Sequence, residues 1–211
     1  MKRATLVLVA LVLLLGGVGQ ASAGFFDNFN SENGGVGQLN YFNFAKWTVA
    51  NAAQGGTVDL IGNGFFDFYP GNGLYVDLDG SGNGTPGLLT TKQTFAPGTY
   101  NFSFDLAGSA RGVDSHVLVN FGPFSQTFFL PSSQGYTLFT ETVTLTAPAQ
   151  LSFQNVEPGD IGAILDNVSV NPTNVVPEPA SLTLLGIGAV GLVGYGRRRR
   201  RQSAQACLHG L

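Results

Sequence analysis

Charged side chains are scarce in this sequence. Asp, Glu, Lys and Arg make up 11% of the 211 residues, a composition that disfavours an intrinsically disordered chain and a nucleic-acid-binding protein. The single cysteine is Cys207, so residues 24–176 cannot form an internal disulfide and their core must be held by packing. Glycine is frequent, with 30 residues, but it does not recur at every third position, which excludes a collagen helix. A turn-rich all-β protein fits this composition.

The net charge of −3 conceals an uneven distribution. Residues 24–176 contain twelve carboxylates against three cations, which are Lys46, Lys92 and Arg111, whereas five further cations are consecutive arginines near the C-terminus. An acidic body repels phosphate backbones, so we expect no nucleic-acid partner.

Residues 1–23 have the layout of a secretory signal peptide. Two basic residues precede an apolar stretch at 4–15, and Ala21-Ser22-Ala23 has the small-x-small pattern of a cleavage site. Gly24 is then the first residue of the mature chain. The alternative is an uncleaved membrane anchor, for which twelve apolar residues are few.

Residues 173–201 combine three features in order. The first is the motif at 176–181, made of Val176, Pro177, Glu178, Pro179, Ala180 and Ser181. The second is the uncharged run 180–196, which predicts one transmembrane helix of about 25 Å, at the short end of the usual range. The third is the basic cluster Arg197, Arg198, Arg199, Arg200 and Arg201. The positive-inside rule keeps these arginines and the tail 202–211 in the cytoplasm and leaves the proline motif outside.

This order of motif, apolar span and arginines resembles the PEP-CTERM sorting signal. The resemblance implies a substrate of an exosortase-type processing enzyme in a Gram-negative bacterium. Such a chain is exported across the inner membrane, anchored there transiently, cleaved near the motif and released to the cell surface or extracellular matrix. The alternative is a simple C-terminal membrane anchor.

Residues 24–172 have the pattern of one β domain. In 98–108 the residues Tyr100, Phe102, Phe104 and Leu106 alternate with polar residues, as in a strand with one buried face. Nine strands are predicted in all, at 58–61, 74–78, 88–95, 98–108, 116–121, 126–130, 137–146, 150–156 and 163–170. Gly and Pro occupy most gaps and no repeat of fixed period is present, which favours an antiparallel β-sandwich or jelly roll over a propeller or solenoid.

Three segments of this domain resemble galactose-binding-like jelly rolls found in carbohydrate-binding modules. They are LYVDLDGSGNG at 74–84, GTYNFSFDLAGSARG at 98–112 and AQLSFQNVEPGDIGAILDNVSV at 149–170. The resemblance implies a jelly-roll fold and, less directly, binding of a polysaccharide.

Catalytic signatures are weak. His116 is the one histidine between residues 24 and 176, and no G-x-S-x-G elbow is present. Glu141 and Glu157 are interpreted as surface or turn residues. The acidic segment 77–83 begins like an EF-hand loop but has Leu88 at the twelfth position, which rejects an EF-hand. It is interpreted as a turn between strands, with a looser metal site of oxygen ligands as the alternative. A non-catalytic protein is therefore favoured over a secreted hydrolase.

Asp166 shares the parity of Ile164, Val168 and Val170, so a strand that turns this parity inward buries its carboxylate. A buried carboxylate requires hydrogen-bond donors or a cation. The resemblance to jelly rolls implies a structural Ca²⁺ between the last strand and the first loop. The residues expected to bind it are Asp27, Asn30, Glu32 and Asp166. The alternative is that Asp166 caps main-chain amides.

Several aromatic residues near Gly- and Asn-rich segments are candidates for stacking on sugars. Trp47 and Tyr69 are the two expected to contact a polysaccharide. Rings occur on both parities of 64–70, so at least one of them is expected to be exposed or to cover a sheet edge. The sequence thus predicts a non-catalytic surface or matrix component, with a polysaccharide-binding module as the alternative.

Overall fold

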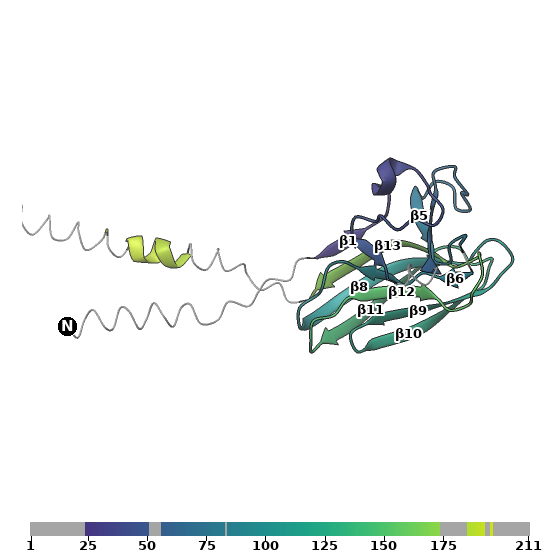
Figure 1. Cartoon of the computed structure of the whole chain (residues 1–211). Helices are drawn as coiled ribbons and strands as arrows, with labels where there is room; N and C mark the ends of the chain where they lie inside the picture. The colour runs from purple at the N-terminus through teal and green to yellow at the C-terminus, as the bar shows by residue number, and fades with distance from the viewer. Residues whose placement is uncertain (1–23, 51–55, 83, 174–184, 193–194, 196–211) are drawn as a thin grey trace, which may run out of the picture. The chain divides into compact units, whose positions relative to one another are not determined.

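The computed structural model describes residues 24–50, 56–82, 84–173, 185–192 and 195 (Figure 1). Residues Ser22–Asn174 belong to one compact unit. Its described part contains a 3-10 helix, η1 (Glu32–Gly35), and thirteen strands. The strands are β1 (Phe25–Asp27), β2 (Trp47–Val49), β3 (Gly56–Thr57), β4 (Asp59–Gly62), β5 (Leu74–Asp77), β6 (Thr85–Pro86), β7 (Leu89–Thr91), β8 (Gly98–Ala107), β9 (Ser115–Phe121), β10 (Phe124–Leu130), β11 (Thr137–Leu145), β12 (Leu151–Asn155) and β13 (Ile164–Pro172).

All nine predicted strands are present in this all-β unit. The expected strand at 88–95 is shorter than predicted, because after Thr91 the chain turns and the Thr91 hydroxyl donates to the main-chain oxygen of Gln93 at 3.0 Å. The prediction missed β1, β2, β3 and β6, which are two or three residues long. Strands this short show no measurable alternation, so the sequence pattern could not reveal them.

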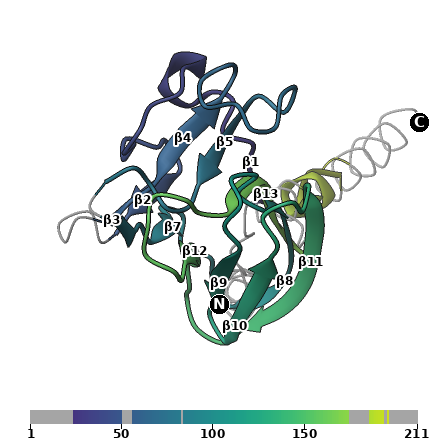
Figure 2. The same cartoon turned by 90° about the vertical axis from the view of Figure 1, so that its right-hand side faces the viewer.

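The strands form two main sheets. The larger has the order β11-β8-β13-β5-β4, with β1 also paired to β13, and the smaller has the order β10-β9-β12-β7-β2. Every pair in these sheets is antiparallel, and a separate short pair, β3 and β6, is parallel. In Figure 2 the strands β10, β9, β12 and β7 stand opposite β11, β8 and β13. This arrangement is a β-sandwich.

Aromatic rings fill the space between the two sheets. The inward residues of β8 are at most 1% exposed, as their alternation predicts. The ring of Phe104 on β8 meets Phe153 on β12 edge to face at 5.1 Å, and Phe102 meets Phe121 on β9 in the same way at 5.4 Å. Edge-to-face pairs of this kind add stability beyond the area they bury.

Strand β13 changes face at a β-bulge. Its pairing with β8 shifts just after Asp166, where Asn167 has a φ of 49°. Val168 and Val170 therefore face the main core, whereas Ile164 packs in a second apolar cluster on another face of the sheet. The predicted single parity of these residues is wrong, because the extra residue of a bulge exchanges the two faces.

Close main-chain packing at Gly108 generates a prediction. A Cβ atom there would lie 2.0 Å from the carbonyl oxygen of Pro131, whereas one at Gly135 would meet no atom within 4 Å. We expect Gly108→Ala to lower the free energy of unfolding by about 1–3 kcal/mol and Gly135→Ala to change it by less than about 0.5 kcal/mol. Urea unfolding followed by Trp47 fluorescence measures both variants. Equal stability of the two would contradict the packing described.

Candidate functional site

The predicted sorting and export segments lie largely outside the described residues. This holds for the signal peptide, the motif at 176–181 and the basic cluster at 197–201, and Gly24 is the first residue described. Within the predicted span 180–196, residues 185–192 and 195 are helical. Among the helices that are described, none has the length and apolar character needed to cross a bilayer.

Trp47 is part of the core and is closed to ligands. Its side chain is 0% exposed, and its ring packs edge to face against Phe25 with centroids 5.3 Å apart. Its Nε1 donates a hydrogen bond of 2.8 Å to the Asp27 carboxylate. The prediction that Trp47 contacts a polysaccharide is therefore wrong, since the indole serves to satisfy a buried acid.

The residues predicted to bind Ca²⁺ instead accept hydrogen bonds from the protein. Asp27 accepts from Trp47 and from a main-chain amide, Asn30 Oδ1 accepts from an amide at 2.7 Å, and both Glu32 oxygens accept from one amide at 2.9 and 3.0 Å. Among the described residues, no three His, Cys, Asp or Glu side chains are placed to hold a metal ion together. The calcium site expected at Asp27, Asn30, Glu32 and Asp166 stays a prediction, and in this structure an oxygen of each residue accepts a hydrogen bond from the protein itself.

Asp166 is buried, with 2% exposure, and its carboxylate meets a main-chain amide, as the alternative interpretation predicts. Its Oδ1 accepts a hydrogen bond of 2.7 Å from the main-chain amide of Asn167. Burial raises the pKa of Asp166 to about 7, and the charges of Asp105 and Asp27 act in the same direction. The carboxyl group is thus held by a main-chain donor at the bulge, and its ionised form is unfavourable.

Aromatic residues of the loop between β4 and β5 cover an outer face of the larger sheet. Phe65, Phe68 and Tyr69 pack against a cluster that includes Tyr75 and Ile164. The hydroxyl of Tyr69 donates to two main-chain carbonyls, at 2.8 and 3.0 Å, which ties the loop to the segments that follow β8 and β10. Tyr69 is accordingly a half-buried tether of this loop.

One ring of the loop points to solvent. Phe66 is 54% exposed and has a φ of 46°, a left-handed conformation that is uncommon for a bulky residue. Its ring meets Phe65 edge to face at 4.9 Å. The prediction that at least one ring of 64–70 is exposed is confirmed at Phe66. Phe66 is among the aromatic candidates for stacking on sugars, although Trp47 and Tyr69 are the two expected to contact a polysaccharide.

A second group of side chains surrounds the turn after β5. Asp77 is 1% exposed; its Oδ1 accepts from the amides of Asp79 and Gly162, and its Oδ2 pairs with the guanidinium of Arg111. Burial raises the pKa of Asp77 to about 6, although Arg111 acts against this rise. Arg111 also donates to the main-chain oxygen of Asp160 at 3.1 Å and lies 4.8 Å from the centre of the Phe68 ring.

Asp79 is the unusual member of this group. Its side chain is 0% exposed, and neither carboxylate oxygen has a hydrogen-bond partner. Burial raises its pKa to about 7, and the negative charges of Asp77 and Asp160 contribute. Sequence reasoning interpreted 77–83 as a simple turn. The overlooked signal is Arg111: it is one of three cations in residues 24–176, and such a cation in an acidic domain is a candidate partner for a buried carboxylate.

His116 and Glu157 form a pair at the start of β9. The Nδ1 atom of His116 lies 2.5 Å from Glu157 Oε1, and the His116 amide donates to Oε2 at 2.8 Å. Burial raises the pKa of Glu157, but these bonds to His116 outweigh burial and hold it below its ordinary value. The sequence pattern indicated a surface or turn position for Glu157 and no pairing with His116.

The comparisons with known proteins bear first on the C-terminal segment. Residues 175–201 match the family model of the PEP-CTERM protein-sorting motif. The chain carries a PEP-CTERM sorting motif. No curated protein matches the chain.

The comparison with solved structures bears on the β-sandwich in front of the PEP-CTERM motif. The K1 cleaved adhesin domain of Lys-gingipain from Porphyromonas gingivalis matches with a TM-score of 0.53 and 13% identity, over 72% of this chain and 99% of that one. The C-terminal CBM6 of the laminarinase LamC from Zobellia galactanivorans has a TM-score of 0.40 and 13% identity, over 71% and 99%. An exo-β-1,3-galactanase from Phanerochaete chrysosporium has a TM-score of 0.40 and 15% identity, over 71% and 29%, so this chain spans under a third of it. The likeness to the adhesin domain shows a shared fold.

The raised pKa of Asp166 predicts a pH-dependent stability. The pKa of Asp166 is about 7 in the folded protein against an ordinary value of 3.8, so the ionised carboxyl lowers the stability of the fold above pH 7 and has no effect below about pH 4. We expect Asp166→Asn to raise the free energy of unfolding at pH 8 by roughly 1–3 kcal/mol. The gain should shrink as the pH falls through 7 and vanish near pH 4. Denaturant unfolding at pH 4, 6 and 8 measures it, and a gain of equal size at all three values would contradict the assignment.

Proposed function

We propose that the protein is an exported, non-catalytic component of the cell surface or extracellular matrix, sorted and cleaved through its C-terminal segment. The observation that carries this proposal is the PEP-CTERM match at 175–201, which contains the proline motif, the apolar run and the arginines in order. An exosortase-type enzyme of the inner membrane is the processing partner. Residues 1–23 supply the signal for export.

The topology of the tail supports processing from the outer side. Moving the five arginines into hydrocarbon would cost about 2.5–3.5 kcal/mol each on insertion scales, so they stay on the cytoplasmic side. The motif Pro177-Glu178-Pro179 then lies at the outer interface. Its prolines keep the segment extended, which suits entry into an active-site cleft.

The sorting proposal predicts the fate of the motif. Changing Pro177, Glu178 and Pro179 together to alanine should leave the tail attached and the protein in the membrane, because the processing enzyme loses its recognition sequence. Intact mass spectrometry of surface-released protein from the native host should give a wild-type mass without 197–211. The control is a triple alanine variant at Gln202, Ser203 and Gln205, which we expect to be processed normally. Released protein that retains 197–211, or an unaltered fate of the motif variant, would refute the proposal.

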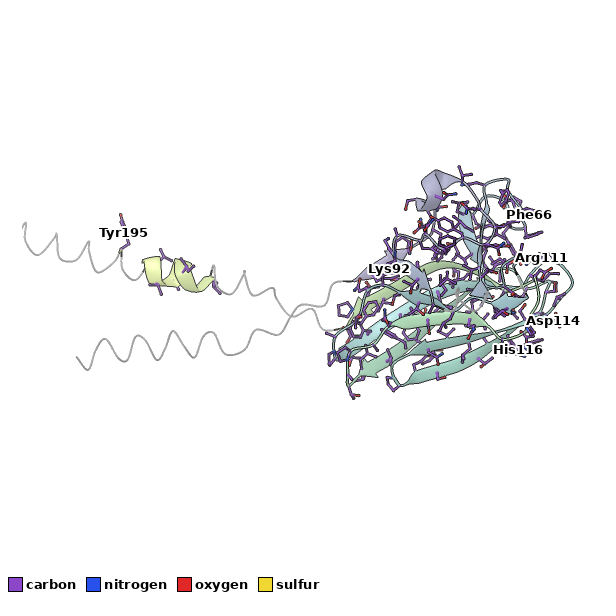
Figure 3. All side chains as sticks on the ribbon, in the orientation of Figure 1. Phe66, Lys92, Arg111, Asp114, His116 and Tyr195 are labelled. Atoms are coloured by element: carbon purple, nitrogen blue, oxygen red, sulfur yellow. The ribbon has the colours of Figure 1, made fainter. Side chains whose placement is uncertain are left out.

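A second candidate function is binding of a polysaccharide, and the observation that favours it is the exposed ring of Phe66. This ring stands beside Phe65 on a loop tied down by Tyr69. In Figure 1, β1 begins and β13 ends at the left of the domain, and in the same orientation in Figure 3, Phe66 and Arg111 lie at the right. Phe66 and Arg111 thus lie toward the end of the domain opposite the start of β1 and the end of β13.

This candidate predicts a position-specific loss of binding. If Phe66 stacks on a sugar ring, Phe66→Ala should weaken retardation in polysaccharide affinity gels by about tenfold in Kd, which corresponds to about 1.4 kcal/mol. The matched control is Phe129→Ala on β10, because Phe129 is 55% exposed against 54% for Phe66. Equal loss in both variants, or no retardation of the wild type by any polysaccharide tested, would exclude this function.

A further inference from the structure

The carboxylate of Asp79 needs a partner that the described residues do not supply. It is 0% exposed and both of its oxygens lack a hydrogen bond. A buried carboxylate is unfavourable unless donors or a cation meet it. The other buried acids of the domain accept hydrogen bonds, as Asp27, Glu32, Asp59 and Asp77 do. Asp79 is thus an exception within a domain that otherwise satisfies its buried carboxylates.

The negative charges around Asp79 favour a cation as the missing partner of its carboxylate. The charges of Asp59, Asp77 and Asp160 all act on Asp79, and Arg111 is the cation that opposes them. Arg111 is already engaged, since its guanidinium pairs with Asp77 and donates to the main-chain oxygen of Asp160. With all four acids ionised, the cluster carries an excess of three negative charges.

Two glycines, Gly159 and Gly162, lie against the side chain of Asp79. A Cβ atom on Gly159 would lie 3.4 Å from Asp79 Oδ2, and one on Gly162 would lie 2.8 Å from Asp79 Cβ. The turn that follows Asp79 is held in place, because Asp59 accepts hydrogen bonds from both the amide and the hydroxyl of Ser81, at 3.0 and 2.6 Å. The glycine-containing segment 159–162 and the turn after Asp79 therefore border the buried carboxylate.

Further oxygen atoms without partners border the same turn. Thr57 Oγ1 would lie 2.6 Å and Asn40 Oδ1 3.1 Å from a Cβ atom on Gly82, and both atoms are buried without a hydrogen bond. Carboxylate, hydroxyl and amide oxygens without partners are the kinds of ligand that a hard divalent cation prefers.

We propose that Asp79 is the anchoring ligand of a Ca²⁺ site at the turn after β5, with Asp160 as the second carboxylate. Main-chain carbonyls of the bordering glycine-rich segments and water complete the shell, because Ca²⁺ accepts six to eight oxygen ligands in flexible geometry. Three carboxylates do not converge here. With only two carboxylate ligands, the site belongs to the weak class found in extracellular modules, with Kd of about 10⁻⁴–10⁻³ M. It is distinct from the first-loop residues Asp27 and Glu32.

The test uses the full chain, purified in detergent and freed of metal with EDTA. Titration with CaCl₂ in a calorimeter should give one ion per chain. Calcium at about 100 times Kd should raise Tm by about 5 °C or more relative to the chelated protein. Absence of binding together with identical melting curves would overturn the proposal.

Two variants locate the ion. Asp79→Asn keeps the shape and removes the charge, so it should abolish both the binding heat and the calcium-dependent rise in Tm. The matched control is Asp166→Asn, a second buried acid that has a main-chain donor, and it should retain both. Calcium binding by Asp79→Asn equal to that of the wild type would refute the site.

A third variant covers the case in which Asp79→Asn does not fold. Asp160→Asn changes an exposed side chain, so its fold should be unaffected, and it should weaken calcium binding by about tenfold or more. Unchanged affinity in Asp160→Asn would remove this residue from the site and contradict the proposal as stated. None of these outcomes depends on sorting or on polysaccharide binding.

Discussion

The contact on which the rest of the structure depends is the one between the rings of β8 and the five-stranded sheet. Phe102 and Phe104 meet Phe121 and Phe153 edge to face, and Phe104 also meets Phe128 at 5.4 Å. Strand β8 pairs with β11 on one side and β13 on the other, so these rings fix the centre of the larger sheet against the smaller one. Because residues 24–176 contain no cysteine, packing of this kind replaces the covalent cross-links that many exported domains use.

Several buried carboxylates lie in the part of the larger sheet formed by β4, β5 and β13. Asp59 and Asp77 lie on β4 and β5, and Asp79 and Asp166 lie near the ends of β5 and β13. An acidic domain with few cations must satisfy such groups mainly with main-chain amides and hydroxyls, and this explains why so many loops here run close to a carboxylate. Each of these contacts fixes a loop to the sheet. The Tyr69 hydroxyl joins the loop of Phe66 to the segments after β8 and β10, and Asp59 joins the turn after Asp79 to β4.

The two chain ends and the candidate binding side chains lie at opposite ends of the domain. The end where β1 begins and β13 ends leads to the segments that the sequence predicts for export and sorting, whereas Phe66, Arg111 and His116 lie toward the other end (Figures 1 and 3). The side chains discussed as candidates for binding therefore lie toward the end of the domain opposite its two chain ends. The strongest signal in the sequence concerns sorting, because a sorting motif is a continuous segment of the chain. A binding surface is formed by residues that only the fold brings together.

Local patterns account for what the sequence by itself determined. The order of motif, apolar run and arginines, and the period-two alternation in 98–108, are carried by neighbouring residues, so the PEP-CTERM motif and the central strands could be predicted. The burial of Trp47, the change of face at Asp166 and the pairing of Asp77 with Arg111 were decided by tertiary structure alone. Asp77 and Arg111 are 34 residues apart, and Asp77 and Gly162 are 85 apart, and no local pattern relates such positions. Whether a polar side chain is satisfied depends on which distant donors the fold brings to it, and that information is absent from any single segment of the chain.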